Sequence, residues 1–334
     1  MEVWAVQALN GLTSGLLLFM LGAGLTLIFS MMGVLNFAHT GFYLLGAYIG
    51  WALSGWLGFW YALVLAPLIV GLLGAACQRW LLRAVHRQGH IAELLLTFGV
   101  ALLIVELVQL IWGRSPQAFV PPAALQGAAF TWVHSAQVGL SLHAGDVAPG
   151  LCGPDVRCAI YPATRAFVGA VALLMLVAMA ALLRLTRVGL IVRAALEQPA
   201  MTEALGHNVP RLMMGVFGFG CALAGLAGVI AAATFTLEPG MAASIGSLLF
   251  VVIVVGGLGS LRGAFVGALL VGMLQTLPLA IDATLADAAL RLGWQAPAAL
   301  ARVSVAQIAP VLPYAMLIAV LLWRPQGLFG RAGT

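Results

Sequence analysis

A few polar side chains in this sequence stand inside or beside long apolar stretches, where polar groups are costly and often functional. Glu106 lies within one such stretch, with Gln109 one helical turn further on. Asn36 and His39 follow the first stretch, where a broken helix would leave backbone N–H groups unpaired. These side chains and the unpaired N–H groups could form hydrogen bonds to a polar solute. They also have plainer interpretations, with Glu106 fixing contacts between helices, and Asn36 and His39 capping the next helix.

The residue types exclude several kinds of chemistry. All fifteen basic residues are arginine, so the chain has neither the lysine of a Walker A loop nor a Schiff-base lysine. The glycine-rich turn Gly256–Ser260 is not preceded by a strand, so we interpret Gly256, Gly257 and Gly259 as a tight turn or hinge between helices. The histidines are scattered without the spacing of metal ligands. We therefore expect no metal site and no cofactor.

The four cysteines fall into two pairs. Cys77 and Cys221 stand within apolar stretches and are expected to be buried packing residues. Cys152 and Cys158 bracket the short polar loop C-G-P-D-V-R-C, and they could form a disulfide if that loop faces an oxidising compartment. The closed loop would be small, so its entropic stabilisation would be on the order of 2 kcal/mol.

Membrane-spanning helices must position these residues. Of 334 residues, 63% are hydrophobic and only 7% are charged, against about 25% in soluble domains; mean hydropathy is +1.09. Apolar segments long enough to cross a hydrocarbon core of about 30 Å recur along the chain. The sequence therefore predicts an all-α polytopic transmembrane bundle of about 8–10 spans, forming one domain over residues 1–334. The segments lie at about 5–30, 38–57, 59–82, 91–112, 164–184, 212–235, 243–259, 263–283 and 305–323, and segments 38–57 and 243–259 are candidates for half-spans.

Glycines four residues apart recur in these segments and indicate close packing of helices in the membrane. Such pairs are Gly11 and Gly15, Gly46 and Gly50, and Gly263 and Gly267.

Arginine positions orient the spans, because cytoplasmic segments of membrane proteins carry an excess of positive charge. One side holds ten arginines, at positions 79, 83, 87, 184, 187, 193, 211, 262, 324 and 331, and the other holds five, at 114, 157, 165, 291 and 302. The larger group indicates the cytoplasmic side, with the N-terminus outside. Residues 114–163 then form an external loop and residues 186–211 a cytoplasmic loop. Glu93 is expected at the cytoplasmic interface of its span. The arginines are expected to face membrane lipid, and no nucleic-acid partner is expected.

The cytoplasmic loop has the features of a short helical lever. An alanine-rich helix over residues 190–206 is interrupted by Pro199 and ended by Gly206 in the manner of a C-cap. A short helix between two spans, with charges on one face, suits contact with a soluble partner; the alternative is an ordinary solvated loop.

This loop resembles the EAA-type coupling loop of ATP-binding-cassette importer permeases. Further blocks resemble one family among them, the branched-chain amino acid permeases of high-affinity leucine, isoleucine and valine importers. Thr40 stands where that family usually has glycine, and the loop with the cysteine pair is longer than the family norm. The blocks are GVLNFAHTGFYLLGAYIG (33–50), TFGVALLIVELVQLIWG (97–113), FVVIVVGGLGSLRGAFVGALLVG (250–272) and RPQGLFG (324–330).

The resemblance implies that the chain is not an enzyme but the permease subunit of an importer in the bacterial cytoplasmic membrane. The cargo would be branched-chain or other small neutral amino acids. The partners would be a second homologous permease, two cytoplasmic ATPases and an external or periplasmic substrate-binding protein. The residues expected to couple to the ATPases are Arg193, Glu197, Ala204 and Gly206. The candidates for the pathway are Asn36, His39, Tyr43, Glu106 and Gln109, while Tyr48 either lines the pathway or packs.

Other functions remain open at this point. Related permeases move urea, short amides and organic acids. An ion-coupled secondary transporter would use several acidic residues at depth, and Glu106 is the only clear one. An intramembrane hydrolase would need a serine near a histidine, which spacing does not provide for Ser30, Ser244 or Ser247. No arginine lies clearly within a span, which favours a neutral or zwitterionic solute with an aliphatic part.

Overall fold

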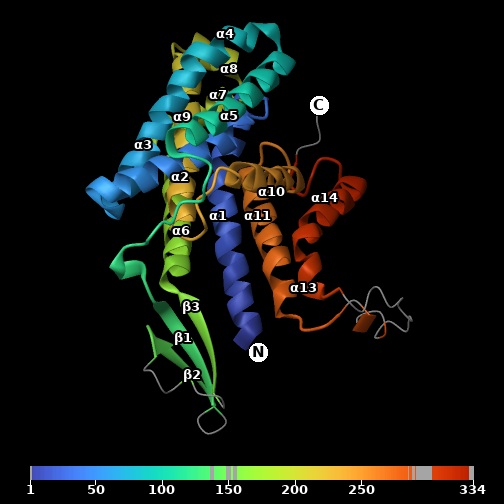
Figure 1. The fold of residues 1–334 in the computed structure, drawn as a ribbon. Coiled ribbons are helices and arrows are strands. Elements are labelled where there is room, and N and C mark those ends of the chain that lie inside the picture. The colour runs from blue at the N-terminus through green and yellow to red at the C-terminus, as the bar shows by residue number, and fades with distance from the viewer. Residues whose placement is uncertain are drawn as a thin grey trace.

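The computed structural model describes residues 2–135, 139–147, 152, 156–284, 286–287, 290 and 303–330. Long helices form a bundle, and a small β-sheet extends from one end of it (Figure 1). The longer helices are α1 (Glu2–Met32), α2 (Ala38–Leu57), α3 (Phe59–Cys77), α5 (His90–Trp112), α6 (Ala163–Leu185), α9 (Val209–Ala232), α10 (Met241–Gly256), α11 (Leu261–Thr276) and α14 (Leu312–Trp323). Short pieces continue or join them: a π-helical turn (Gln78–Leu82), α4 (Arg83–Val85), α13 (Val305–Ile308), and 3₁₀ turns at His86–Gln88, Ala123–Leu125, Leu277–Ala280 and Ala309–Val311.

In the part of the chain that the structure describes, seven helices are long and apolar enough to cross a membrane. The predicted membrane bundle is confirmed: these seven helices meet the length and hydropathy criterion, beside about 8–10 spans predicted from the sequence. The two segments that fall short are α2 and α10, which the sequence marks as candidates for half-spans. At 16 residues, α10 is about 24 Å long, and it lies across the end of α11 (Figure 1).

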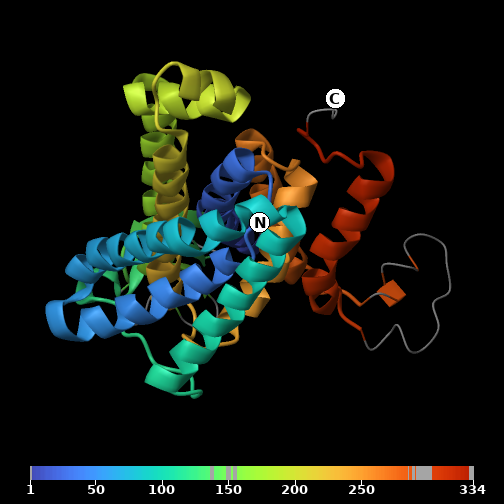
Figure 2. The same cartoon turned by 90° about the horizontal axis from the view of Figure 1, so that it is seen from above.

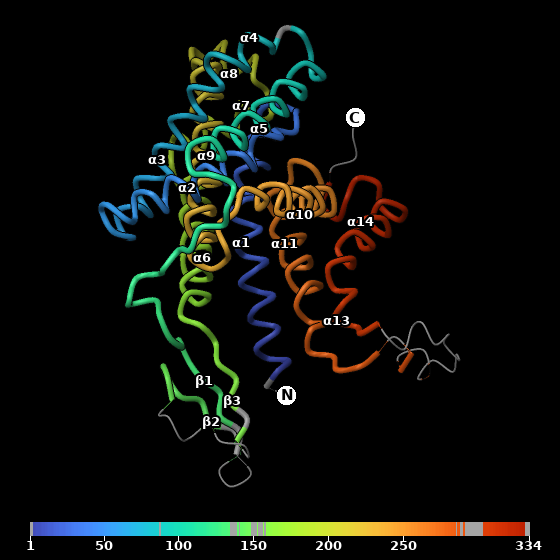
Figure 3. Tube along the Cα trace, viewed as in Figure 1, coloured from blue at the N-terminus to red at the C-terminus, as the bar shows by residue number. Residues whose placement is uncertain are grey.

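The predicted external and cytoplasmic loops lie at opposite ends of the bundle. The β-sheet lies beyond the start of α1, while α4, α7 (Arg187–Glu197) and α8 (Pro199–Ala204) all lie at the other end, as Figures 1 and 3 show. In sequence and in space, α7 and α8 follow the end of α6, and α8 leads into α9 (Figure 2). This arrangement agrees with the sidedness that the arginines indicate.

Small residues set the spacing of the central helices. A Cβ added to Gly46 of α2 would lie 2.4 Å from the Cα of Gly225 in α9, and one on Gly50 would lie 2.6 Å from Val229. On α1, a Cβ on Gly15 would lie 2.9 Å from the carbonyl oxygen of Ala268 in α11. At Gly46 and Gly15 the backbones of two helices are in contact because no side chain stands between them, and at Gly50 the Val229 side chain packs against the helix backbone. The predicted role of the glycine pairs in helix packing is confirmed.

The external loop contains a three-stranded antiparallel sheet, which the all-α prediction did not include. Strands β1 (Ala128–Ser135), β2 (Gly139–Ala144) and β3 (Val156–Pro162) are arranged in the order β2-β1-β3. The ring of Tyr161 stacks on Phe130 at 4.9 Å, and its hydroxyl forms a hydrogen bond with the Thr13 hydroxyl of α1. The sheet is thus attached to the bundle through the external end of α1.

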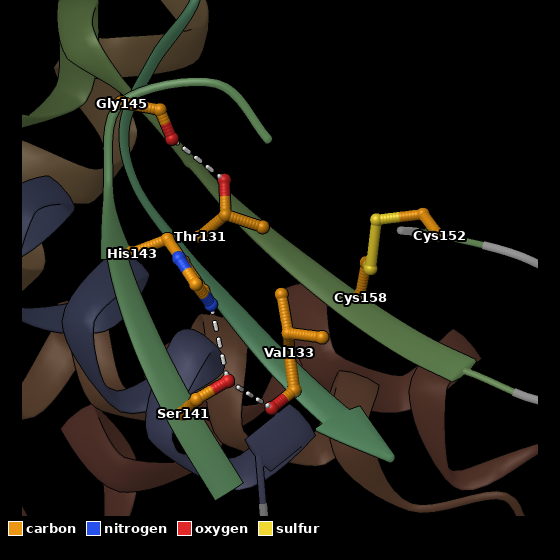
Figure 4. The surroundings of a disulfide bond; sticks show 7 residues. All are labelled: Thr131, Val133, Ser141, His143, Gly145, Cys152 and Cys158. Atoms are coloured by element: carbon orange, nitrogen blue, oxygen red, sulfur yellow. Dashed lines mark hydrogen bonds between the residues drawn. A yellow bond between two sulfur atoms is a disulfide. The ribbon is translucent and has the colours of Figure 1, made fainter. Parts of the chain in front are cut away.

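The structure joins Cys152 and Cys158 in a disulfide, with their Cα atoms 5.9 Å apart. Cys158 lies in β3, and the bond ties the preceding loop to that strand (Figure 4). In the same sheet, the Thr131 hydroxyl donates to the carbonyl of Gly145 at 3.0 Å. Cys77 and Cys221 are free and buried, as predicted. The disulfide closes a local ring and stiffens the sheet without joining it to the helices.

Thiol labelling of the native protein in intact, unreduced membranes tests this pair. We expect no reaction of a membrane-impermeant maleimide at Cys152 or Cys158 before reduction, and reaction at both thiols afterwards. Removing the bond should cost on the order of 2 kcal/mol at most, because the closed loop is short. Two reactive external thiols in the unreduced protein would contradict the assignment.

Candidate functional site

The cytoplasmic loop folds as two short helices with a break between them. α7 (Arg187–Glu197) and α8 (Pro199–Ala204) meet at Gln198, whose backbone leaves the helical region. Proline stands in the first turn of α8, where its missing N–H costs no helical hydrogen bond. Gly206 has φ of +88°, and its N–H donates to the carbonyl of Glu203. The break at Pro199 and the stop at Gly206 are as predicted, although the predicted helix 190–206 is two helices.

One side of α7 is fixed to the bundle. Val192 and Ala195 are buried, and Gly189 is so close to α6 that an added Cβ would lie 2.2 Å from the carbonyl oxygen of Leu182. The Thr186 hydroxyl accepts a hydrogen bond from the Gly189 N–H and caps the helix. These contacts hold α7 to the end of α6, which is one of the long apolar helices.

The other side of the loop is open to the cytoplasmic end. The four predicted coupling residues, Arg193, Glu197, Ala204 and Gly206, are all exposed. Two large apolar side chains are exposed beside them, Met201 at 63% and Leu205 at 79%. Exposed apolar side chains that are grouped together, with charges around them, are typical of a surface that another protein covers.

A polar groove lies next to this surface. A cavity of about 630 Å³ opens between the turn after α8 and the π-helical turn after α3, and Arg79, Arg83, Glu203, His207 and Arg211 are among its lining residues. A second cavity of about 590 Å³ shares Arg83 and Glu203 with it. A π-helical turn within a longer helix often marks a functional site. The groove carries more positive than negative charge and lies at the end of the bundle that the arginines predict to be cytoplasmic.

Two of the predicted pathway residues have structural roles in this chain. The Asn36 side chain accepts a hydrogen bond from the Ala38 N–H at 3.1 Å, at the start of α2. His39 is fully buried, and its Nε2 lies 3.0 Å from the carbonyl oxygen of Leu21 in α1. Asn36 also lines a cavity of about 320 Å³. The helix-capping interpretation therefore fits Asn36, while His39 ties α2 to α1.

The two tyrosines of α2 differ in their surroundings. Tyr48 is fully buried, and its ring lies 5.5 Å from that of Trp112, so it packs against α5. Tyr43 lines a cavity of about 390 Å³ together with Glu238 and Gln275. The sequence analysis predicted Tyr43 as a pathway residue, but it did not predict Glu238 or Gln275. Glu238 lies in the F-T-L-E-P-G connection after α9, an acidic residue between two apolar segments that could have indicated the site.

Glu106 and Gln109 lie on the outer side of α5. Glu106 is exposed and Gln109 partly exposed, among exposed apolar side chains such as Leu102 and Leu110. They therefore do not meet Asn36, His39 or Tyr43 in one place. Glu93 lies in the first turn of α5, at the end of that span; only 1% of it is exposed, and one of its carboxylate oxygens contacts His86.

The predicted glycine turn connects three parts of the chain. Gly257 and Gly259 have φ of +102° and +75°. The Ser30 hydroxyl at the end of α1 donates to the carbonyl of Gly259 at 3.1 Å. The N–H of Phe329 donates to the carbonyl of Gly256 at 3.0 Å. The C-terminal R-P-Q-G-L-F-G block is thus held against this turn, and a hinge there stays a prediction.

Comparison with known proteins places these features in a family. The sequence model of the family described as "Branched-chain amino acid transport system / permease component" matches residues 7–321. The chain is 26% identical to the high-affinity branched-chain amino acid transport system permease protein LivH of Escherichia coli K12, over 97% of this chain and 95% of LivH. It is also 26% identical to the high-affinity branched-chain amino acid transport system permease protein BraD of Pseudomonas aeruginosa, over 97% of this chain and 95% of BraD. It is also 28% identical to LivM of Salmonella typhimurium, over 77% of this chain and 60% of LivM. No solved structure matches the chain significantly.

Proposed function

This chain belongs to the family of permease components of branched-chain amino acid transport systems, and on that premise we propose that it carries branched-chain amino acids across the bacterial cytoplasmic membrane as part of an ATP-binding-cassette importer. The names of LivH and BraD, both high-affinity branched-chain amino acid transport system permease proteins, support this cargo. LivH and LivM are two different permease proteins, and both are named as parts of a high-affinity branched-chain amino acid transport system. Their shared similarity to this chain supports a second, homologous permease as its partner.

The observation that carries the proposal is the exposed surface of α7 and α8. It is anchored to α6 on one side and presents Met201, Leu205 and Glu197 on the other. Since the chain has no lysine for a Walker A loop, we propose that a separate ATPase subunit covers this surface. A second ATPase subunit would cover the equivalent surface of the second permease. The basic groove beside α8 is then available to acidic side chains of the ATPase.

We further propose that the outer face of α5 contacts the second permease and the substrate pathway. Glu106 is exposed on this face among leucines. A charged group facing lipid near the centre of a membrane costs about 2.5–3.5 kcal/mol or more. Contact with a second chain, or with water in a pathway between the two chains, removes this cost. Gln109, one turn away, would face the same pathway.

Cross-linking tests the proposed docking surface. In the purified complex, we expect Met201→Cys to form a cross-link to the ATPase subunit with a short bifunctional thiol reagent. Leu110→Cys is the matched control, because Leu110 is also highly exposed, at 82%, but lies on α5 within the membrane. A cross-link to the ATPase from Leu110→Cys and none from Met201→Cys would contradict the proposed orientation of the loop.

A further inference from the structure

The cavity lined by Tyr43 has a size and a position that suit a small ligand. Its volume is about 390 Å³, within the range of about 300–1,000 Å³ that is typical of small-molecule sites. Residues of four helices and one connection line it: α1, α2, α10 and α11, with residues 235–238 that lead into α10. It lies where helices that are distant in the sequence meet, and it is open on one side, where Glu238 and Ser244 are exposed.

The lining divides into an apolar part and a polar part. Leu17, Leu18 and Leu248 are among the residues that provide the apolar part. Among the residues that the structure describes, Glu238 is the only carboxylate in the lining, and no arginine or histidine lines the cavity. Uncharged hydrogen-bonding groups complete it. This combination favours a ligand with one cationic group and an aliphatic part.

We propose that this cavity is a binding site within the permease for a small aliphatic amino acid in transit. The inference rests on the proposed transport function and adds the site and its chemistry. The carboxylate of Glu238 would bind the α-ammonium group through a charge-assisted hydrogen bond. The hydroxyls of Tyr43 and Ser14 and the amide of Gln275 would donate to the ligand carboxylate. The leucine side chains would surround the aliphatic part.

Two contacts link this cavity to the external end of the protein. Tyr161 of β3 bonds to Thr13, the residue before Ser14. The Gln117 N–H, in the connection from α5 to the sheet, donates to the carbonyl of Leu237 at 2.8 Å, the residue before Glu238. The cavity thus adjoins the structure that a substrate arriving from outside would meet first.

Two serines of α10 provide a matched test. Ser244 lines this cavity, whereas Ser247 lines the neighbouring cavity and pairs with Tyr314. Both serines are exposed in this chain. Each would be replaced by cysteine in the assembled transporter, where the free native thiols are buried. We expect leucine to slow maleimide labelling of Ser244→Cys several-fold and to leave Ser247→Cys unchanged.

The role of Glu238 is tested in the same assay. Glu238→Gln should weaken protection by leucine about tenfold to a hundredfold, as expected for loss of a hydrogen bond to a charged group. In the unaltered protein, 4-methyl-2-oxopentanoate, which lacks the ammonium group of leucine, should give no protection. This ligand comparison keeps the test valid if the Glu238→Gln protein folds poorly. Equal protection by leucine and the oxo acid, or none by leucine, would overturn the proposal.

Uptake assays separate this inference from the proposed function. If the Glu238→Gln transporter takes up leucine with an unchanged KM while Ser244→Cys is not protected, the site is wrong and the transport function stands. If the unaltered transporter takes up no amino acid but leucine still protects Ser244→Cys, the site stands and the transport function is wrong.

Discussion

Valine in place of Gly206 is expected to uncouple ATP hydrolysis from transport, while the chain still folds and enters the membrane. Gly206 has φ of +88°, a conformation that a β-branched residue rarely adopts. An added Cβ would meet nothing within 4 Å, so the effect arises from the backbone and not from a clash. The turn after α8 would change its path and move Ala204 and Leu205 on the proposed docking surface. We expect uptake to fall by about tenfold or more, with ATP hydrolysis by the complex retained.

Asparagine at the same position is the matched control, because it tolerates a positive φ far better than valine. Uptake by the Gly206→Asn transporter should remain close to that of the unaltered protein. Replacement of Glu197 by alanine should uncouple more mildly, since it removes one exposed side chain and leaves the turn intact. Full uptake by the Gly206→Val transporter would show that the shape of this turn does not matter for coupling.

Alanine in place of Gly46 is expected to destabilise the whole bundle. The added Cβ would lie 2.4 Å from the Cα of Gly225 and 2.6 Å from its carbonyl oxygen. Neither atom can move away without moving α9, because both belong to the backbone. Overpacking of this kind costs about 1–3 kcal/mol or more. We expect a clear fall in the melting temperature of the purified protein, measured by tryptophan fluorescence in detergent, and a lower yield of folded protein.

Gly55, on the same helix, provides the comparison. An added Cβ there would meet nothing within 4 Å, and alanine favours the helical conformation over glycine. The Gly55→Ala protein should therefore melt at the same temperature as the unaltered protein or slightly higher. Equal melting temperatures for Gly46→Ala and Gly55→Ala would contradict the close contact between α2 and α9.

Much of the fold follows from local features of the sequence. The apolar runs define the membrane helices, because each must be long enough to cross the hydrocarbon core. Pro199 and Gly206 indicate where the cytoplasmic helices break and end, since their effects act on the backbone at those residues. The sheet in the external loop was not predicted. Its strands are short and are stabilised by pairing and by the contact of Tyr161 with α1, which local patterns do not reveal.

The candidate sites were predictable only in part. The residues predicted to couple to an ATPase lie close together in the sequence, and the structure places all of them on one exposed loop. The pathway candidates were chosen for their depth within apolar segments, but depth does not say which way a side chain faces. Glu106 faces outward from α5, whereas Glu238, just beyond an apolar segment, lines a cavity with Tyr43. Such a cavity forms only when distant helices pack together, and no spacing within one helix predicts it.

The central claim is that this chain forms the path of an ATP-driven amino acid importer. Its most direct test is uptake of labelled leucine into proteoliposomes that contain this chain, its partner permease and the ATPases, with the binding protein added outside and ATP enclosed. Labelled urea serves as the competing cargo. We predict accumulation of leucine that requires both ATP and the binding protein, with urea not accumulated. Leucine uptake that persists without ATP, or accumulation of urea in place of leucine, would contradict it.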